Sequence, residues 1–131
     1  MKLLLVEDDK ATVYAVKMCF EIYLPETNVF STTQGLEALR MLKKHEYDGV
    51  IIDLGLPDID GMLVLEELRK FSNVPMIIFS ARHSLEIIAR ATELGASDYV
   101  AKPFDYRVLL KRIKHAVEKS SAPAALTPAA V

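Results

Sequence analysis

Short apolar runs of strand length recur along the chain, and each one is followed by a more polar segment. The five runs are Lys2–Val6, Asn28–Ser31, Gly49–Asp53, Pro75–Ser80 and Asp98–Ala101. The first, third and fourth runs are continuously apolar, which is typical of parallel strands buried on both faces. The second and fifth are more mixed, which predicts positions nearer the edges of the sheet.

The segments between these runs have the periodicity of amphipathic helices. Their apolar faces are marked by Val13, Val16 and Phe20, by Ala38, Leu39 and Leu42, by Leu65 and Leu68, by Ile88, Ala91 and Leu94, and by Leu109, Ile113 and Val117. The first helix is expected to end before Pro25, the third to begin at Asp60-Gly61, and the fourth to stop at Gly95. Five βα units predict a doubly wound α/β fold, with a parallel sheet covered by helices on both faces.

The composition fits one folded domain. The chain has 131 residues, of which 51% are hydrophobic and 26% charged. We expect the domain to span residues 1–119. Residues 120–131 (SSAPAALTPAAV) lack an amphipathic stripe and are rich in Ala, Pro and Ser, so a flexible tail or linker is predicted there.

Charge and hydropathy limit the functional classes. The formal charge of −2 argues against a broad basic surface, so we expect no direct nucleic-acid binding by this domain. No apolar run approaches the roughly 20 residues of a membrane span, which predicts a cytoplasmic protein without membrane contact. The single Cys19 excludes an internal disulfide and a cysteine-built zinc site.

Polar residues follow the predicted strands, and strand ends are where open α/β sheets bind ligands. Glu7, Asp8 and Asp9 follow the first strand, Asp53 ends the third, Ser80 ends the fourth, and Lys102 follows the fifth. Clustered carboxylates stay ionised together only if a cation lies among them, and oxygen ligands suit Mg²⁺. A lysine ammonium suits a phosphoryl oxygen, so the set suggests phosphoryl transfer to an aspartate.

Each of these residues also has a simpler interpretation. The acidic run could cap the first helix, Asp53 could be a turn residue, and Ser80 could bond to the nearby backbone. Lys102 could be solvated, and Tyr99 could be a core residue. The ordered combination on successive strand ends favours the functional interpretation.

At this point the sequence resembles the receiver (phosphoacceptor) domain of bacterial two-component response regulators. The resemblance covers residues 2–119, through LLLVEDD, VIIDLGLPDIDG, IIFSA and YVAKPF in that order. It implies a flavodoxin-like fold, with a five-stranded sheet of order 2-1-3-4-5 and five surrounding helices. It also implies a phosphorelay protein that is a phosphoacceptor switch rather than a conventional enzyme.

The resemblance assigns a role to each acidic residue. Asp53 resembles the phosphoacceptor, which takes a phosphoryl group from a partner histidine kinase in a Mg²⁺-dependent reaction. Asp8 resembles the direct Mg²⁺ ligand, and Glu7 resembles its acidic neighbour, which holds the ion through water. Asp53 itself and the backbone carbonyl of Gly55 would complete the protein ligands.

The resemblance also assigns the groups around the phosphoryl group. Lys102 resembles the lysine that pairs with it, and a cis Lys102-Pro103 bond is implied. Ser80 resembles the switch hydroxyl, and the backbone N–H of Ala81 should contact the same phosphoryl group. Tyr99 resembles the aromatic switch, which turns inward when Ser80 moves and so changes the face formed by the fourth helix, fifth strand and fifth helix.

The implied partners are a sensor histidine kinase or phosphotransfer protein, and an output domain or target protein. A weak or phosphorylation-dependent homodimer is also implied. Asp98 and Arg112 resemble one salt bridge of the dimer face of winged-helix regulators, but Ile88 and Val108 stand where an opposite-charge pair is expected. Positions 55 and 82, here glycine and arginine, are ones at which family members differ with their rate of dephosphorylation. The lifetime of the phosphoryl group therefore does not follow from the resemblance.

Three other functions were weighed against this one. An aspartate-nucleophile phosphatase needs a second acid two residues after the nucleophile, where this chain has Gly55. A nucleotide-binding domain needs a glycine-rich loop after the first strand, where this chain reads VEDDKAT. A phosphorylation-independent interaction module of receiver fold is the remaining alternative, and the complete set of Asp8, Asp53 and Lys102 argues against it.

Overall fold

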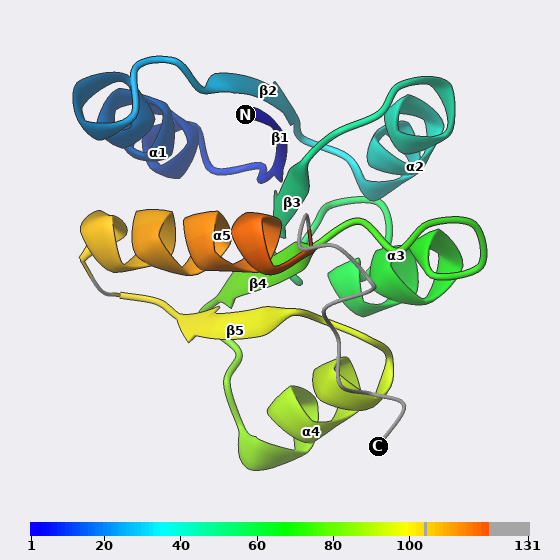
Figure 1. Cartoon of the computed structure of the whole chain (residues 1–131). Coiled ribbons are helices and arrows are strands. Elements are labelled where there is room, and N and C mark those ends of the chain that lie inside the picture. The colour runs from blue at the N-terminus through cyan, green and yellow to red at the C-terminus, as the bar shows by residue number, and fades with distance from the viewer. Residues whose placement is uncertain (104, 121–131) are drawn as a thin grey trace, which may run out of the picture.

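The computed structural model describes residues 1–103 and 105–120 (Figure 1). Strands and helices alternate throughout this part of the chain. In order they are β1 (Lys2–Val6), α1 (Lys10–Tyr23), β2 (Asn28–Thr32), α2 (Gly35–Lys44), β3 (Gly49–Ile52), α3 (Gly61–Leu68), β4 (Met76–Ser80), α4 (Leu85–Glu93), β5 (Asp98–Ala101) and α5 (Tyr106–Ser120). The predicted series of five βα units is confirmed.

The strands form one sheet of order β2-β1-β3-β4-β5, in which all neighbouring strands are parallel. This confirms the predicted order, and the two more mixed runs are indeed the edge strands. The helix α5 includes Ser120, whereas the rest of the expected tail, residues 121–131, lies outside the described residues. No helix in the described part of the chain is long and apolar enough to cross a bilayer.

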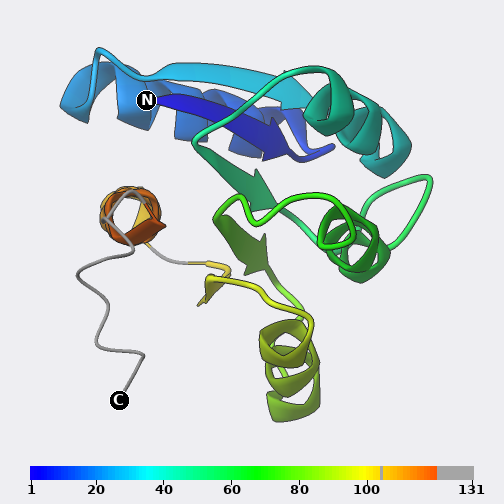
Figure 2. The ribbon, with the colours of Figure 1, turned by 45° about the vertical axis from the view of Figure 1, so that its right-hand side comes forward.

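Helices cover both faces of the sheet, and Figures 1 and 2 show α1 and α5 on one side and α2, α3 and α4 on the other. Successive side chains of a strand point to opposite faces, so each central strand contributes to both cores. In β1, Leu3 and Leu5 pack with α1 and α5, while Leu4 and Val6 pack with the other three helices. This two-sided burial explains why the central strands are continuously apolar.

Some boundaries differ from the expectation. Asp53 lies just beyond β3 rather than within it, and Pro75 precedes β4. In α4 it is Ile87 rather than Ile88 that packs on the core, because Ile87, Ala91 and Leu94 follow one another at helical spacing along the buried side. Gly95 has a positive φ of 98° and ends this helix, as predicted.

Gly61 brings the start of α3 against the end of β3. Its N–H donates to the carbonyl oxygen of Leu54 at 2.9 Å. A Cβ at this position would lie 2.5 Å from the carbonyl oxygen of Asp53 and 2.8 Å from Leu54 Cα. Since these are backbone atoms, a side chain here could be accommodated only by moving the loop that follows Asp53.

We therefore expect Gly61→Ala to lower the free energy of unfolding by roughly 1–3 kcal/mol, the usual cost of an extra methyl group in a packed site. Gly55→Ala is the matched control, because a Cβ there would have nothing within 4 Å. Its effect should be within about 0.5 kcal/mol. Denaturant unfolding measures both, and equal stability of the two variants would contradict the close approach.

Candidate functional site

The sheet itself positions the candidate residues. The N–H of Glu7 donates to Thr32 O at 3.0 Å, and the N–H of Asp53 donates to Val6 O at 3.0 Å. Beyond the ends of β4 and β5, the N–H of Lys102 donates to Ser80 O at 2.9 Å. Each residue thus continues the hydrogen-bond ladder just beyond a strand, which fixes its backbone and directs its side chain to the carboxyl edge of the sheet.

Three carboxylates meet at this edge. Glu7, Asp8 and Asp53 each offer an oxygen, and these oxygens all lie within 4.8 Å of one another. Glu7 is buried, with 2% of its side chain exposed, whereas Asp8 is exposed. The Lys102 ammonium lies 2.9 Å from a Glu7 oxygen and 3.4 Å from an Asp53 oxygen, so one cation offsets two of the negative charges.

The electrostatic environment shifts the pKa values of the two carboxyl groups that Lys102 contacts in opposite directions. Burial raises the pKa of Glu7 to about 7, and the charge of Asp53 adds to this against the lowering effect of Lys102. Burial also raises the pKa of Asp53, but Lys102 and hydrogen bonds from Ser80 and Glu7 outweigh it and hold that pKa below its usual value. Asp53 therefore stays ionised at neutral pH, as a nucleophile requires, while Glu7 readily takes a proton.

Asp9 has a different role from its two acidic neighbours. Its carboxylate accepts hydrogen bonds from the backbone N–H, at 3.2 Å, and the hydroxyl of Thr12. Asp9 is thus the N-cap of α1, as the simpler interpretation of the acidic run proposed for that residue. Glu7 and Asp8 instead belong to the carboxylate cluster.

The residues of the expected switch lie on β4 and β5. Ser80 is buried, and its hydroxyl accepts a hydrogen bond from the Arg82 N–H at 3.2 Å. Ala81 follows β4 directly. The ring of Tyr99 packs against the core on the α2–α4 side, and its hydroxyl is buried, with Ser80 close enough to interact with it. The Lys102-Pro103 bond is cis, as expected.

Two further carboxylates were not expected among the site residues, although Asp60 was expected to begin the third helix. Asp60 pairs with Arg82 at 2.9 Å and is the N-cap of α3. Asp58 accepts hydrogen bonds from the backbone N–H groups of Gly35 and Leu36, at the start of α2. The one sequence signal for the Asp58 contact is Gln34, because glutamine is not favoured as an N-cap and α2 therefore lacks a local one.

The donor set fits Mg²⁺. Carboxylate oxygens are its preferred protein ligands, and it usually retains several waters rather than taking a complete cage of side chains. Glu7, Asp8 and Asp53 offer three such oxygens, and the exposure of Asp8 leaves room for water. The cluster therefore offers the oxygen ligands and the space for water that a hydrated divalent cation needs.

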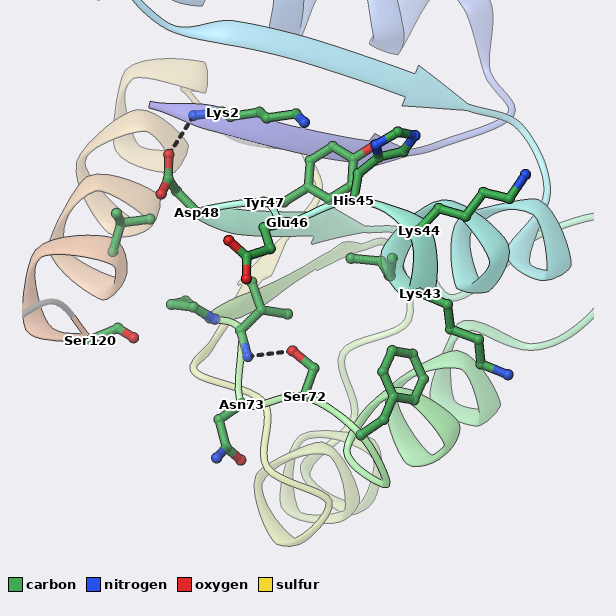
Figure 3. Close-up of a pocket in the computed structure, with 15 residues that line it drawn as sticks. Lys2, Lys43, Lys44, His45, Glu46, Tyr47, Asp48, Ser72, Asn73 and Ser120 are labelled. Carbon is green, nitrogen blue, oxygen red and sulfur yellow. Dashed lines mark hydrogen bonds between the residues drawn. The ribbon is translucent and has the colours of Figure 1, made fainter.

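A sizeable hollow in the described part of the chain lies elsewhere. It has a volume of about 750 Å³ and lies at the opposite end of the sheet, between α2, the start of β4 and the end of α5 (Figure 3). There the Lys2 ammonium lies 4.8 Å from the ring centre of Tyr47, and the Lys2 N–H donates to Asp48 at 2.7 Å. Its charged groups do not converge on one point, so size alone does not make it the reactive site.

Comparisons with known proteins identify related chains. A family model described as the response regulator receiver domain matches residues 3–114. The transcriptional regulatory protein KdpE of Mycobacterium tuberculosis (strain ATCC 25618 / H37Rv) is 37% identical over 126 residues, which are 96% of this chain and 55% of that protein. The chain thus spans about half the length of the curated relatives it matches.

Solved structures show the same fold. The receiver domain of the Francisella response regulator 1452 has a TM-score of 0.85 and 32% identity, over 92% of this chain and 98% of that one. The receiver domain of the sensor histidine kinase PA1611 from Pseudomonas aeruginosa PAO1 has a TM-score of 0.79 and 25% identity, over 89% and 97%. That structure has a magnesium ion coordinated in its active site cleft.

The pKa of Glu7 predicts how Mg²⁺ binding depends on pH. A cation displaces the proton from a carboxyl group, so protonation of Glu7 competes with binding. With a pKa of about 7, the apparent Mg²⁺ affinity should fall between pH 8 and pH 6, by up to about tenfold if one proton is released. Isothermal titration calorimetry at both pH values measures this change.

Glu7→Gln is the control for this prediction. Since glutamine does not titrate, the variant should bind Mg²⁺ with nearly the same affinity at both pH values, although more weakly than the wild type does at pH 8. An equally steep pH dependence in Glu7→Gln would show that another group releases the proton.

Proposed function

The chain belongs to the response regulator receiver domain family, whose members are phosphorelay signalling switches, and from this premise we propose that Asp53 accepts the phosphoryl group. The observation that carries the assignment is the pairing of Asp53 with Lys102 beside two further carboxylates. Asp53 follows the central strand β3, and its lowered pKa keeps it ionised. Asp8 is exposed, and Glu7 readily takes a proton, so each suits the role of nucleophile less well.

The proposed reaction is a phosphoryl transfer from a phosphohistidine of a partner kinase or phosphotransfer protein. A carboxylate oxygen of Asp53 forms a bond to phosphorus, and the P–N bond breaks with its electron pair passing to the imidazole. Lys102 lies within reach of Asp53 and offsets the charge on the phosphoryl oxygens. The backbone N–H of Ala81 would donate to the same oxygens.

Mg²⁺ is the proposed cofactor. Asp8 would bind it directly, Glu7 would hold it through water, and Asp53 and the carbonyl of Gly55 would supply the other protein ligands. When bound, the ion neutralises charge on the carboxylates and on the transferred group. The three carboxylate oxygens within 4.8 Å of one another support this ligand set.

We propose that Ser80 and Tyr99 convert phosphorylation into a change of shape. Burial raises the pKa of the Tyr99 hydroxyl, and the neighbouring Ser80 side chain acts against this shift, so the two side chains of the proposed switch already interact. If Ser80 moves toward the phosphoryl group, the space beside Tyr99 changes. The balance between inward and outward positions then shifts on the face formed by α4, β5 and α5.

That face is the proposed contact to an output domain or target protein. Asp98 and Arg112 lie on this face and pair with each other within the chain, with 3.0 Å between the charged groups. Val108 is 38% exposed and Ile88 is half-buried, so two apolar side chains stand in place of a second charged pair. Any homodimer through this face would therefore rely on apolar contact as well as on charge.

Several expectations remain proposals at this point. They are a receiver domain spanning residues 1–119 with a linker from residue 120, a cytoplasmic location, and the absence of direct nucleic-acid binding by this domain. A phosphorylation-independent module is not favoured, because Asp8, Asp53 and Lys102 are all present, and Asp53 and Lys102 are in contact. A phosphatase is not favoured, because Gly55 supplies no acid near the nucleophile.

The phosphoacceptor assignment predicts a single modification. Incubation with Mg²⁺ and acetyl phosphate should add one phosphate to the intact protein, detected by mass spectrometry. Asp53→Asn should abolish the addition, because it removes the nucleophilic oxygen and keeps the shape of the side chain. Asp48→Asn, at the other end of the sheet, is the matched control and should be labelled like the wild type. Labelling of Asp53→Asn at the wild-type level would exclude Asp53.

A further inference from the structure

The loop between β3 and α3 is hydrogen-bonded to α2, a helix that contributes no residue to the site. One carboxylate oxygen of Asp58 accepts from the N–H of Gly35 at 2.8 Å, and the other accepts from the N–H of Leu36 at 2.9 Å. These two N–H groups lie in the first turn of α2, where a helix has no carbonyl partners of its own. Gln34, the N-cap of that helix, makes no side-chain capping bond.

Asp58 therefore caps α2 from a distance of more than twenty residues in sequence. Desolvation raises the pKa of Asp58, but the hydrogen bonds from the backbone N–H groups of Leu36 and Gly35 outweigh this effect, so the net shift is downward. The ionised form is thus the one that the contact favours. The partial positive charge of the helix N-terminus acts in the same direction.

Apolar packing supports the same contact. A Cβ on Gly35 would lie 2.6 Å from Ile59 Cγ1 and 2.8 Å from Val64 Cγ2, so α2 approaches the loop and α3 as closely as a glycine permits. Ile59 follows Asp58 directly. The polar and the apolar contacts together hold this half of the loop against α2.

The other half of the loop carries the group proposed to bind Mg²⁺. The N–H of Leu56 donates to the carbonyl oxygen of Leu54 at 3.0 Å, which closes a three-residue turn around Gly55. Gly55 itself is exposed, and no neighbouring atom lies within 4 Å of where its Cβ would be. The N–H of Gly55 donates to the Asp53 carboxylate at 3.4 Å, and its carbonyl is otherwise positioned by the chain on either side of it, namely by buried Leu54 before it and by the Asp58 contact after it.

We propose that Asp58 is a positioning residue for Mg²⁺ binding, since its contact with α2 holds the loop that presents the Gly55 carbonyl. The inference rests on the proposed function of the site. A loop that adopts the binding geometry only part of the time has an apparent affinity reduced by that fraction. Loss of a helix cap costs roughly 1 kcal/mol, so Asp58→Ala should weaken Mg²⁺ binding by up to about fivefold.

Two further variants separate hydrogen bonding from charge. Asp58→Asn keeps a capping oxygen and loses the charge, whereas Asp58→Glu keeps the charge on a longer side chain that does not cap well. If positioning is the cause, the asparagine variant should bind Mg²⁺ within about twofold of wild type, and the glutamate variant should resemble alanine. Wild-type affinity in Asp58→Glu with a loss in Asp58→Asn would assign the effect to charge alone and overturn the proposal.

Stability and loop order need separate readouts. Ser84→Ala removes the N-cap of α4, whose hydroxyl accepts from the Ile87 N–H at 3.3 Å, and should leave Mg²⁺ affinity unchanged. Hydrogen exchange in EDTA should be faster at Gly35, Leu36 and residues 54–59 in Asp58→Ala than in wild type. Unchanged exchange and unchanged affinity would overturn the proposal. Absence of Mg²⁺ binding in the wild type would instead contradict the proposed function, and this inference with it.

Discussion

Repulsion among three carboxylates at one edge of the sheet is the constraint on which the rest of the site depends. The parallel strands bring Glu7, Asp8 and Asp53 together because their carboxyl ends meet at that edge. The Lys102 ammonium offsets part of the negative charge, and the pKa of about 7 at Glu7 allows a proton to offset more. A divalent cation bound here would replace that proton, so the proposed metal binding and phosphoryl acceptance would both be coupled to protonation through the same few oxygens.

The surrounding fold keeps these groups in place against that repulsion. Glu7, Asp53 and Lys102 are fixed by backbone hydrogen bonds that extend the sheet ladders, and buried apolar residues pack on both faces beneath them. The loop after Asp53 has no such ladder. It depends on Gly61, which meets the Asp53 backbone, and on Asp58, which meets α2. The edge of the sheet is thus held by backbone hydrogen bonds and core packing, and the loop beside it by a few specific contacts.

The sequence predicted the strand order, through the family resemblance, and the convergence of acids, hydroxyl and lysine, through the rule that parallel strands end at one edge. The sequence did not predict the contacts that form only when segments distant in sequence pack together. Asp58 reaches α2 only because two distant segments pack together, and nothing near Asp58 in the sequence marks its partner. The inward position of Tyr99 likewise follows from packing, and the choice of Ile87 over Ile88 follows from where α4 begins.

The most direct test is the free energy of unfolding of wild type and Asp8→Ala, measured in EDTA and again in saturating Mg²⁺. In EDTA the variant should be at least as stable as the wild type, because one of three crowded charges is gone. In Mg²⁺ the order should reverse, because an ion that binds only the folded state stabilises the wild type and should do so much less for the variant. Equal stabilisation of both proteins by Mg²⁺ would contradict the account.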